Sequence, residues 1–148
     1  MHVDSLPLKA PEHCASSRVL LIDDDPILLG LLTSAFRNDG FLATAADNGR
    51  QALALLRAGC FVLVVTDIVM PDIEGIGTIL QIKRKPQPPK VIAISGAGRG
   101  GRRDYLSWAK HLGADEVLAK PFRMTQILAL SKRLISNDSS NVVELGRR

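Results

Sequence analysis

Five polar residues stand at the ends of four short apolar runs, and their types suit metal and phosphoryl chemistry. They are Asp23, Asp24, Asp67, Ser95 and Lys120. Carboxylate oxygens are the ligands that Mg²⁺ takes, while an ammonium and a hydroxyl can hold phosphoryl oxygens. A carboxylate placed in line with a phosphoryl donor can accept the group and form an acyl phosphate. The residues therefore predict a Mg²⁺-dependent site built around acidic side chains.

The acidic residues are not equivalent. Asp23 and Asp24 are adjacent, and neighbouring carboxylates repel each other unless a cation balances them, so the pair predicts a bound Mg²⁺. Asp67 ends a continuous apolar run and precedes a segment with Pro and Gly, which makes it the candidate nucleophile. Asp25 stands before Pro26 and is expected to cap a helix instead.

The elements that must position these side chains are alternating strands and helices. Short apolar runs separated by helix-like segments are typical of buried parallel strands, so the predicted fold is α/β, with a doubly wound five-stranded parallel sheet of the (βα)5 type. The crossover rules bring the carboxyl ends of such strands to one edge of the sheet, where a site can form. The expected strands lie at about residues 18–22, 41–45, 61–66, 90–95 and 116–119, each followed by a helix.

The helix boundaries are indicated by caps and breakers. Pro26 suits the first position of a helix that stops at Asn38, and Asp47 or Asn48 can cap the next, which ends near Gly59. Three prolines after residue 85 end the third helix, and a fourth is expected over 104–112. The last helix begins near Thr125, and the polar residues after Ser136 are expected to fray.

Length and composition are consistent with one domain. Of the 148 residues, 1–17 are expected to form a flexible N-terminal segment, 18–136 the domain, and 137–148 a polar tail. The two cysteines predict no disulfide framework, and Cys60 is expected to be a small buried hydrophobe. No apolar segment has the length of a membrane span, and residues 1–17 lack the apolar stretch of a signal peptide, so a cytoplasmic location is expected.

The chain is basic, with a formal net charge of +4 and a sequence pI of about 9.4. This balance permits contact with an acidic partner without establishing one. The basic clusters lack the interleaved aromatic residues of a strand-binding surface, so they are interpreted as solvated loops and helix ends. Neither nucleic acid nor a membrane is expected as a partner.

Four local motifs together resemble the response-regulator receiver domain of two-component signalling, over about Arg18 to Ser136. Residues 19–26 are similar to the family's first strand and acidic pair, and Asp67 with Met70, Pro71 and Gly75 resembles its phosphoacceptor segment. The run 94–96 resembles the switch hydroxyl followed by a small residue. Gly113-Ala114-Asp115, leading to Lys120-Pro121-Phe122, resembles the closing motif.

The resemblance implies a role for each site residue. Asp67 is expected to receive phosphate from a phosphohistidine of a histidine kinase or a histidine phosphotransfer protein. Mg²⁺ is expected to bind Asp24, Asp67 and the backbone carbonyl of Val69, with Asp23 acting mainly through water. Ser95 and Lys120 are expected to bind the phosphoryl oxygens, and the Lys120–Pro121 peptide is expected to be cis. Such a protein catalyses its own phosphorylation and dephosphorylation and is no classical enzyme.

Three features depart from the family pattern. Val117 stands three residues before Lys120, where the family usually has Tyr or Phe, so the usual aromatic switch partner of Ser95 is missing. The loop Gly96 to Arg103 is longer and richer in Gly and Arg than is typical. Neither Val69 nor Ala97 can position an attacking water, which predicts a long-lived phosphoaspartate.

Other functions stay open at this point. An aspartyl-nucleophile, Mg²⁺-dependent phosphatase would also place Asp and Mg²⁺ at a parallel-sheet edge. Such enzymes have an Asp-x-Asp pattern at the first strand, however, and the acidic residues here are contiguous. A nucleotide-binding loop is excluded because the glycines of 96–101 do not fit the phosphate-loop spacing. An unphosphorylated adaptor is disfavoured by the intact site residues. With no helix-turn-helix expected after Ser136, output is expected through an unidentified protein target.

Overall fold

The computed structural model describes residues 17–68, 74–96, 107, 109–111 and 113–146. Their strands form one parallel sheet in the order β2-β1-β3-β4-β5. This confirms the predicted five-stranded α/β fold, with boundaries that differ from the expected ones by two residues or fewer. The strands are β1 (Arg18–Ile22), β2 (Leu42–Ala46), β3 (Leu63–Asp67), β4 (Lys90–Ser95) and β5 (Glu116–Ala119).

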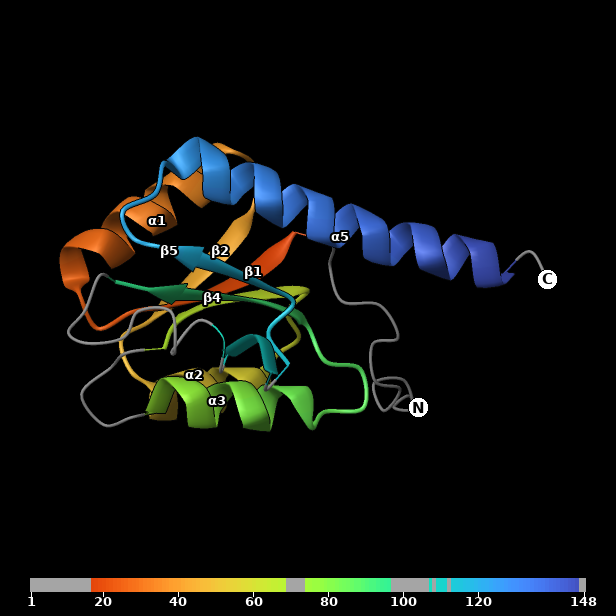
Figure 1. The fold of residues 1–148 in the computed structure, drawn as a ribbon, viewed down its shortest axis with the longest axis horizontal. Helices are drawn as coiled ribbons and strands as arrows, with labels where there is room; N and C mark the ends of the chain where they lie inside the picture. Colours follow the sequence, from red (N-terminus) through yellow and green to blue (C-terminus); the bar gives the residue numbers. More distant parts are fainter. Residues whose placement is uncertain (1–16, 69–73, 97–106, 108, 112, 147–148) are drawn as a thin grey trace, which may run out of the picture.

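Helices cover both faces of the sheet. Those with described bounds are α1 (Pro26–Asn38), α2 (Gly49–Ala58), α3 (Glu74–Lys83) and α5 (Met124–Gly146). Figure 1 shows α1 and α5 on one face and α2 and α3 on the other. Because side chains of a strand alternate between faces, Leu20 and Ile22 join the core under α2 and α3, whereas Val19 and Leu21 join the core under α1 and α5.

Two polar residues start helices as predicted. The Asp25 carboxylate accepts hydrogen bonds from the backbone N–H groups of Ile27 and Leu28, with Pro26 in the first turn. Asn48, rather than Asp47, caps α2 by accepting from the Gln51 N–H at 2.8 Å. The first cap matters for the site, because it turns the chain out of β1 immediately after Asp23 and Asp24.

The last helix is longer than predicted. It runs as one element from Met124 to Gly146, so the expectation of a frayed tail from Ser136 is wrong. The polar residues 136–141 are weak helix formers, but no Gly or Pro interrupts the segment before Gly146, and a helix already begun continues at one hydrogen bond per added residue. The predicted fourth helix lies mostly outside the described residues, although Ser107 and 109–111 are helical.

Cys60 was predicted to be a small buried hydrophobe, and the two cysteines were predicted to form no disulfide framework; both predictions are wrong. Cys60 is half-buried and disulfide-bonded. The run of apolar residues after it predicted burial, but Cys60 lies in the connection between α2 and β3, outside both elements. Within the described part of the chain, no helix has both the length and the apolar character needed to cross a bilayer.

Candidate functional site

The five predicted site residues lie at the carboxyl ends of four strands. Asp23 and Asp24 follow β1, Asp67 ends β3, Ser95 ends β4, and Lys120 follows β5. The parallel register pairs Asp67 with Ile94 and Ser95 with Ala119, so these ends stand side by side. The tertiary structure therefore brings together residues that span 97 positions of sequence.

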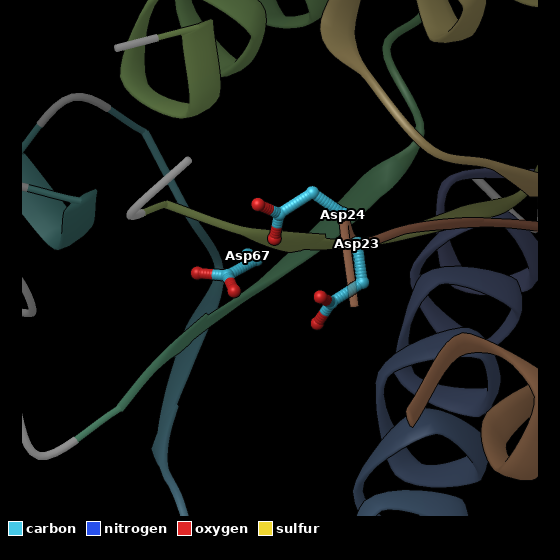
Figure 2. Close-up of side chains that lie close together, drawn as sticks. All are labelled: Asp23, Asp24 and Asp67. Atoms are coloured by element: carbon cyan, nitrogen blue, oxygen red, sulfur yellow. The ribbon is translucent and has the colours of Figure 1, made fainter. Parts of the chain in front are cut away.

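Three carboxyl groups form the acidic part of the site. Asp23, Asp24 and Asp67 each offer one oxygen within 4.8 Å of the others. Figure 2 shows the three groups gathered where β1 and β3 end. Asp23 and Asp67 are buried, whereas Asp24 is exposed, which leaves the cluster open to solvent on one side.

The cluster suits Mg²⁺ in ligand type, and its oxygens are close enough for one ion to be shared. Mg²⁺ prefers hard oxygen donors at about 2.1 Å, so oxygens on opposite sides of an octahedral ion lie about 4.2 Å apart. Three ligands of one octahedral ion include adjacent pairs, which lie about 3 Å apart. The oxygens here all lie within 4.8 Å of one another, so the side chains have to draw together around the ion. Val69, the predicted backbone ligand, lies outside the described residues.

The ammonium of Lys120 places a positive charge in the site. Its Nζ lies 2.9 Å from Oδ2 of Asp67 and 3.4 Å from Oδ2 of Asp23. Burial by itself would lower the pKa of Lys120, but the hydrogen bond and charge of Asp67, with a smaller effect of Asp23, outweigh burial and raise it. Lys120 therefore stays charged and holds the two buried carboxylates together.

The carboxyl of Asp23 is buried next to a second carboxylate. Burial raises the pKa of its carboxyl, and the nearby charge of Asp67 adds to this. Two contacts act in the opposite direction: the Asp25 N–H donates to Oδ1 at 2.8 Å, and Lys120 approaches Oδ2. The net rise means that a further cation near Asp23 would be favourable.

Ser95 is fully buried at the end of β4, and its hydroxyl donates to the carbonyl of Gly96 at 3.3 Å. Its own carbonyl accepts the Lys120 N–H at 2.8 Å, which joins the ends of β4 and β5. The Lys120–Pro121 peptide is cis, as the resemblance implied. Val117 is half-buried and packs against the core under α2 and α3. Ala97 and the loop to Arg103 lie outside the described residues.

Comparison with known proteins decides the family. The model of the response regulator receiver domain matches residues 19–132. The chain belongs to this family. It is a receiver domain of the two-component response regulators, and its fold is the one that receiver domains share.

Relatives of this receiver domain include longer proteins. The transcriptional regulatory protein CpxR homolog of Haemophilus influenzae is 34% identical over 132 residues, covering 85% of this chain and 56% of the relative. The transcriptional activator protein PfeR of Pseudomonas aeruginosa is 29% identical over 133 residues, covering 90% of this chain and 42% of that protein. The receiver domain described here thus spans about half the length of the curated relatives it matches.

Solved structures show the same architecture. A response regulator receiver domain protein from Clostridium thermocellum superposes with a TM-score of 0.75 at 26% identity, covering 85% of this chain and 98% of that one. A CheY-like receiver domain protein from Methanospirillum hungatei gives 0.76 at 24% identity, covering 84% and 98%, which shows the fold alone. Receiver domains bind Mg²⁺ through acidic residues, and this chain has such a cluster.

One polar cluster of this receiver domain was missed by sequence reasoning. Asp115 was noted only as part of a motif, yet its carboxylate lies 2.8 Å from the ammonium of Lys83 and 2.8 Å from the backbone N of Val91. The partners are 32 and 24 positions away in sequence, so no local pattern indicates them. The sequence feature that could have indicated this cluster is the Gly-x-Asp pattern of residues 113–115, directly before a predicted strand.

Proposed function

We propose that this receiver domain accepts a phosphoryl group onto Asp67 from a phosphohistidine of a histidine kinase or histidine phosphotransfer protein. The observation that carries the proposal is the pairing of the Asp67 carboxylate with the Lys120 ammonium inside a three-carboxylate cluster. A carboxylate in this position has a positive charge beside it and two further acidic groups able to hold a metal.

In the proposed reaction an oxygen of Asp67 attacks the phosphorus of the phosphohistidine. The new O–P bond forms as the P–N bond breaks, the imidazole nitrogen keeps the electron pair, and Asp67 becomes an acyl phosphate. Lys120 moves from the carboxylate to the incoming phosphoryl oxygens, and the buried hydroxyl of Ser95 turns to donate to another of them. Such transfer depends mainly on positioning and charge stabilisation.

Asp23, Asp24 and Asp67 are the residues that would hold Mg²⁺, with the carbonyl of Val69 as a further proposed ligand. Bound there, Mg²⁺ supplies positive charge for the phosphoryl oxygens. The negative charges of Asp23 and Asp24 also remain when no phosphoryl group is bound, so the site favours binding of a cation over an anion.

We further propose that the phosphorylated form signals through contacts with a protein target. Ser95 is the proposed sensor, because it ends β4 at the site and is joined to Lys120 through its carbonyl. Val117 offers no ring to change position with it, so the response is proposed to differ from that of family members with an aromatic residue there. Val69 and Ala97 carry no group able to activate water, which favours a long-lived phosphoaspartate.

The proposal is tested by covalent labelling. Wild type and Asp67→Asn are incubated with Mg²⁺ and phosphoramidate, a small donor with a P–N bond, and intact mass is measured. We expect one phosphoryl group on wild type and none on Asp67→Asn. Asp39→Asn serves as the matched control, because Asp39 is an acidic residue outside the cluster. Its Oδ2 pairs with Nζ of Lys132 at 2.7 Å.

Equal labelling of wild type and Asp67→Asn would contradict the proposal. Sustained turnover of a phosphoester, with product in large excess over protein, would instead support the Mg²⁺-dependent phosphatase. Loss of the label from purified phosphoprotein within seconds would contradict the long-lived phosphoaspartate while leaving Asp67 as the acceptor.

A further inference from the structure

β5, the strand that leads to Lys120, pairs with a neighbouring strand on one side only in the described sheet. β5 is the shortest strand, it lies at the edge of the sheet beside β4, and each of its four residues is half-buried. An edge strand of this kind is held on one side only, so its register depends strongly on what fixes its two ends.

The end of β5 far from the site is fixed by Asp115. Its carboxylate oxygen Oδ2 accepts from the Val91 N–H and from the Lys83 ammonium, each at 2.8 Å. Its backbone N–H donates to the Val91 carbonyl at 2.8 Å, and its carbonyl accepts from the Lys110 ammonium at 3.0 Å. Through its side chain and its backbone, Asp115 thus binds Val91, the second residue of β4.

Lys83, the last residue of α3, links Asp115 to this helix and to the loop before β4. Its ammonium also donates to the Pro89 carbonyl at 3.1 Å. To reach Asp115 its stem passes over Gly113, where a Cβ would lie 3.0 Å from Cγ of Lys83 and where φ is +120°. Gly113 therefore serves two needs at once: it allows the left-handed turn and leaves space for the lysine.

The other end of β5 enters the site directly. The Lys120 N–H donates to the Ser95 carbonyl at 2.8 Å, and the ammonium lies against Asp67 and Asp23. Only the four residues of β5 stand between Asp115 and Lys120, so a shift at one end of so short a strand is passed to the other.

We propose that Asp115 is a positioning residue for Lys120. By holding β5 in register against β4, with Lys83 as its partner, it keeps the Lys120 ammonium at the distance from Asp67 that phosphoryl transfer needs. The inference rests on the proposed function, because it concerns the step in which Lys120 meets the phosphoryl oxygens.

The test measures the rate of phosphorylation by phosphoramidate at saturating Mg²⁺. Asp115→Ala is expected to lower the rate on the order of tenfold to a hundredfold, the cost of misplacing a group by about 1 Å. Asp115→Asn keeps an oxygen that can accept from Val91 and is expected to recover most of the rate. Lys132→Met, which removes an ion pair between α5 and Asp39, is the matched control and is expected to label at the wild-type rate.

A double-mutant cycle separates positioning from general destabilisation. If Asp115 acts through Lys120, then Asp115→Ala added to Lys120→Met lowers the rate no further. The Mg²⁺ affinity of Asp115→Ala, measured by calorimetry, is expected to equal or exceed that of wild type. The three carboxylates lie at the ends of β1 and β3, away from β5, and a displaced Lys120 would repel the metal less. General destabilisation of the site would instead weaken Mg²⁺ binding. An equal loss in both backgrounds, or a wild-type rate in Asp115→Ala, would overturn the inference.

Lys83→Met provides a second variant if Asp115→Ala does not fold. It removes the ammonium but leaves the bond from Val91, and a rate loss of severalfold that disappears in the Lys120→Met background is expected. A wild-type rate in Lys83→Met would overturn the inference. Failure of the proposed function is recognised separately, because wild type and Asp67→Asn would then carry equal label.

Discussion

The ammonium of Lys120 lies 2.9 Å from Oδ2 of Asp67, although 53 positions separate the two residues in sequence. The contact joins the residue after an edge strand to the last residue of the central strand. It makes the lysine the cation that occupies the acidic cluster in the described structure, and so a competitor of any metal that binds there.

Removing that ammonium is expected to change metal binding and phosphorylation in opposite directions. In Lys120→Met, Mg²⁺ binds more tightly because a repelling positive charge is gone. Phosphorylation by phosphoramidate slows on the order of 10²- to 10³-fold, the usual cost of losing one group that stabilises transition-state charge. Calorimetry and intact mass give the two readouts, and weaker Mg²⁺ binding in the variant would contradict the assigned role.

Mg²⁺ is expected to stabilise the folded protein through the three carboxylates. At a free concentration of about 100 times its Kd, a ligand that binds only the folded state raises the free energy of unfolding by about 2.7 kcal/mol. Chemical denaturation with and without Mg²⁺ measures this difference. Asp24→Asn is expected to lose most of the increase and Asp39→Asn to keep it; an unchanged increase in Asp24→Asn would argue against the cluster as the metal site.

The raised pKa of Asp23 predicts a dependence of stability on pH when no metal is present. The ordinary value is 3.8 and the folded value is higher, so between the two the folded state binds more protons than the unfolded state. Stability from this group is therefore full below pH 3.8 and is lost as the pH rises through the folded pKa.

Asp23→Asn should remove that loss, because the amide carries no charge at any of these pH values. In EDTA, we expect the variant to have a higher Tm than wild type at neutral pH, with the difference shrinking toward pH 4. The Asn oxygen can still accept the Asp25 N–H. A variant that is less stable than wild type at pH 7 in EDTA would show that burial does not dominate at Asp23.

A core substitution tests the packing that holds α1 beside the site. Phe36 is fully buried on α1, and its ring lies 5.3 Å from the ring of Phe41. Phe36→Ala is expected to lower the free energy of unfolding by about 3–5 kcal/mol, the usual range for removing a buried aromatic ring. Urea denaturation measures it; a loss below about 1 kcal/mol would indicate that the cavity collapses.

Much of this molecule could be predicted from local sequence. Buried parallel strands are continuous apolar runs, and Asp23, Asp67, Ser95 and Lys120 each stand at the end of one, so the strands and their polar ends are visible without coordinates. The cap at Asp25 could also be predicted, because it depends only on residues within one turn of the helix.

Tertiary structure decided what depends on distant partners. The raised pKa of Asp23 follows from burial, which no short segment reveals, and the distance from Lys120 to Asp67 follows from the register of β5 on β4. The hydrogen bonds of Asp115 with Lys83 and Val91 join three segments that share no sequence pattern. Sequence determined which residues reach this edge of the sheet, because strand ends are local; structure decided their charge balance and spacing, because both are set by neighbours far along the chain.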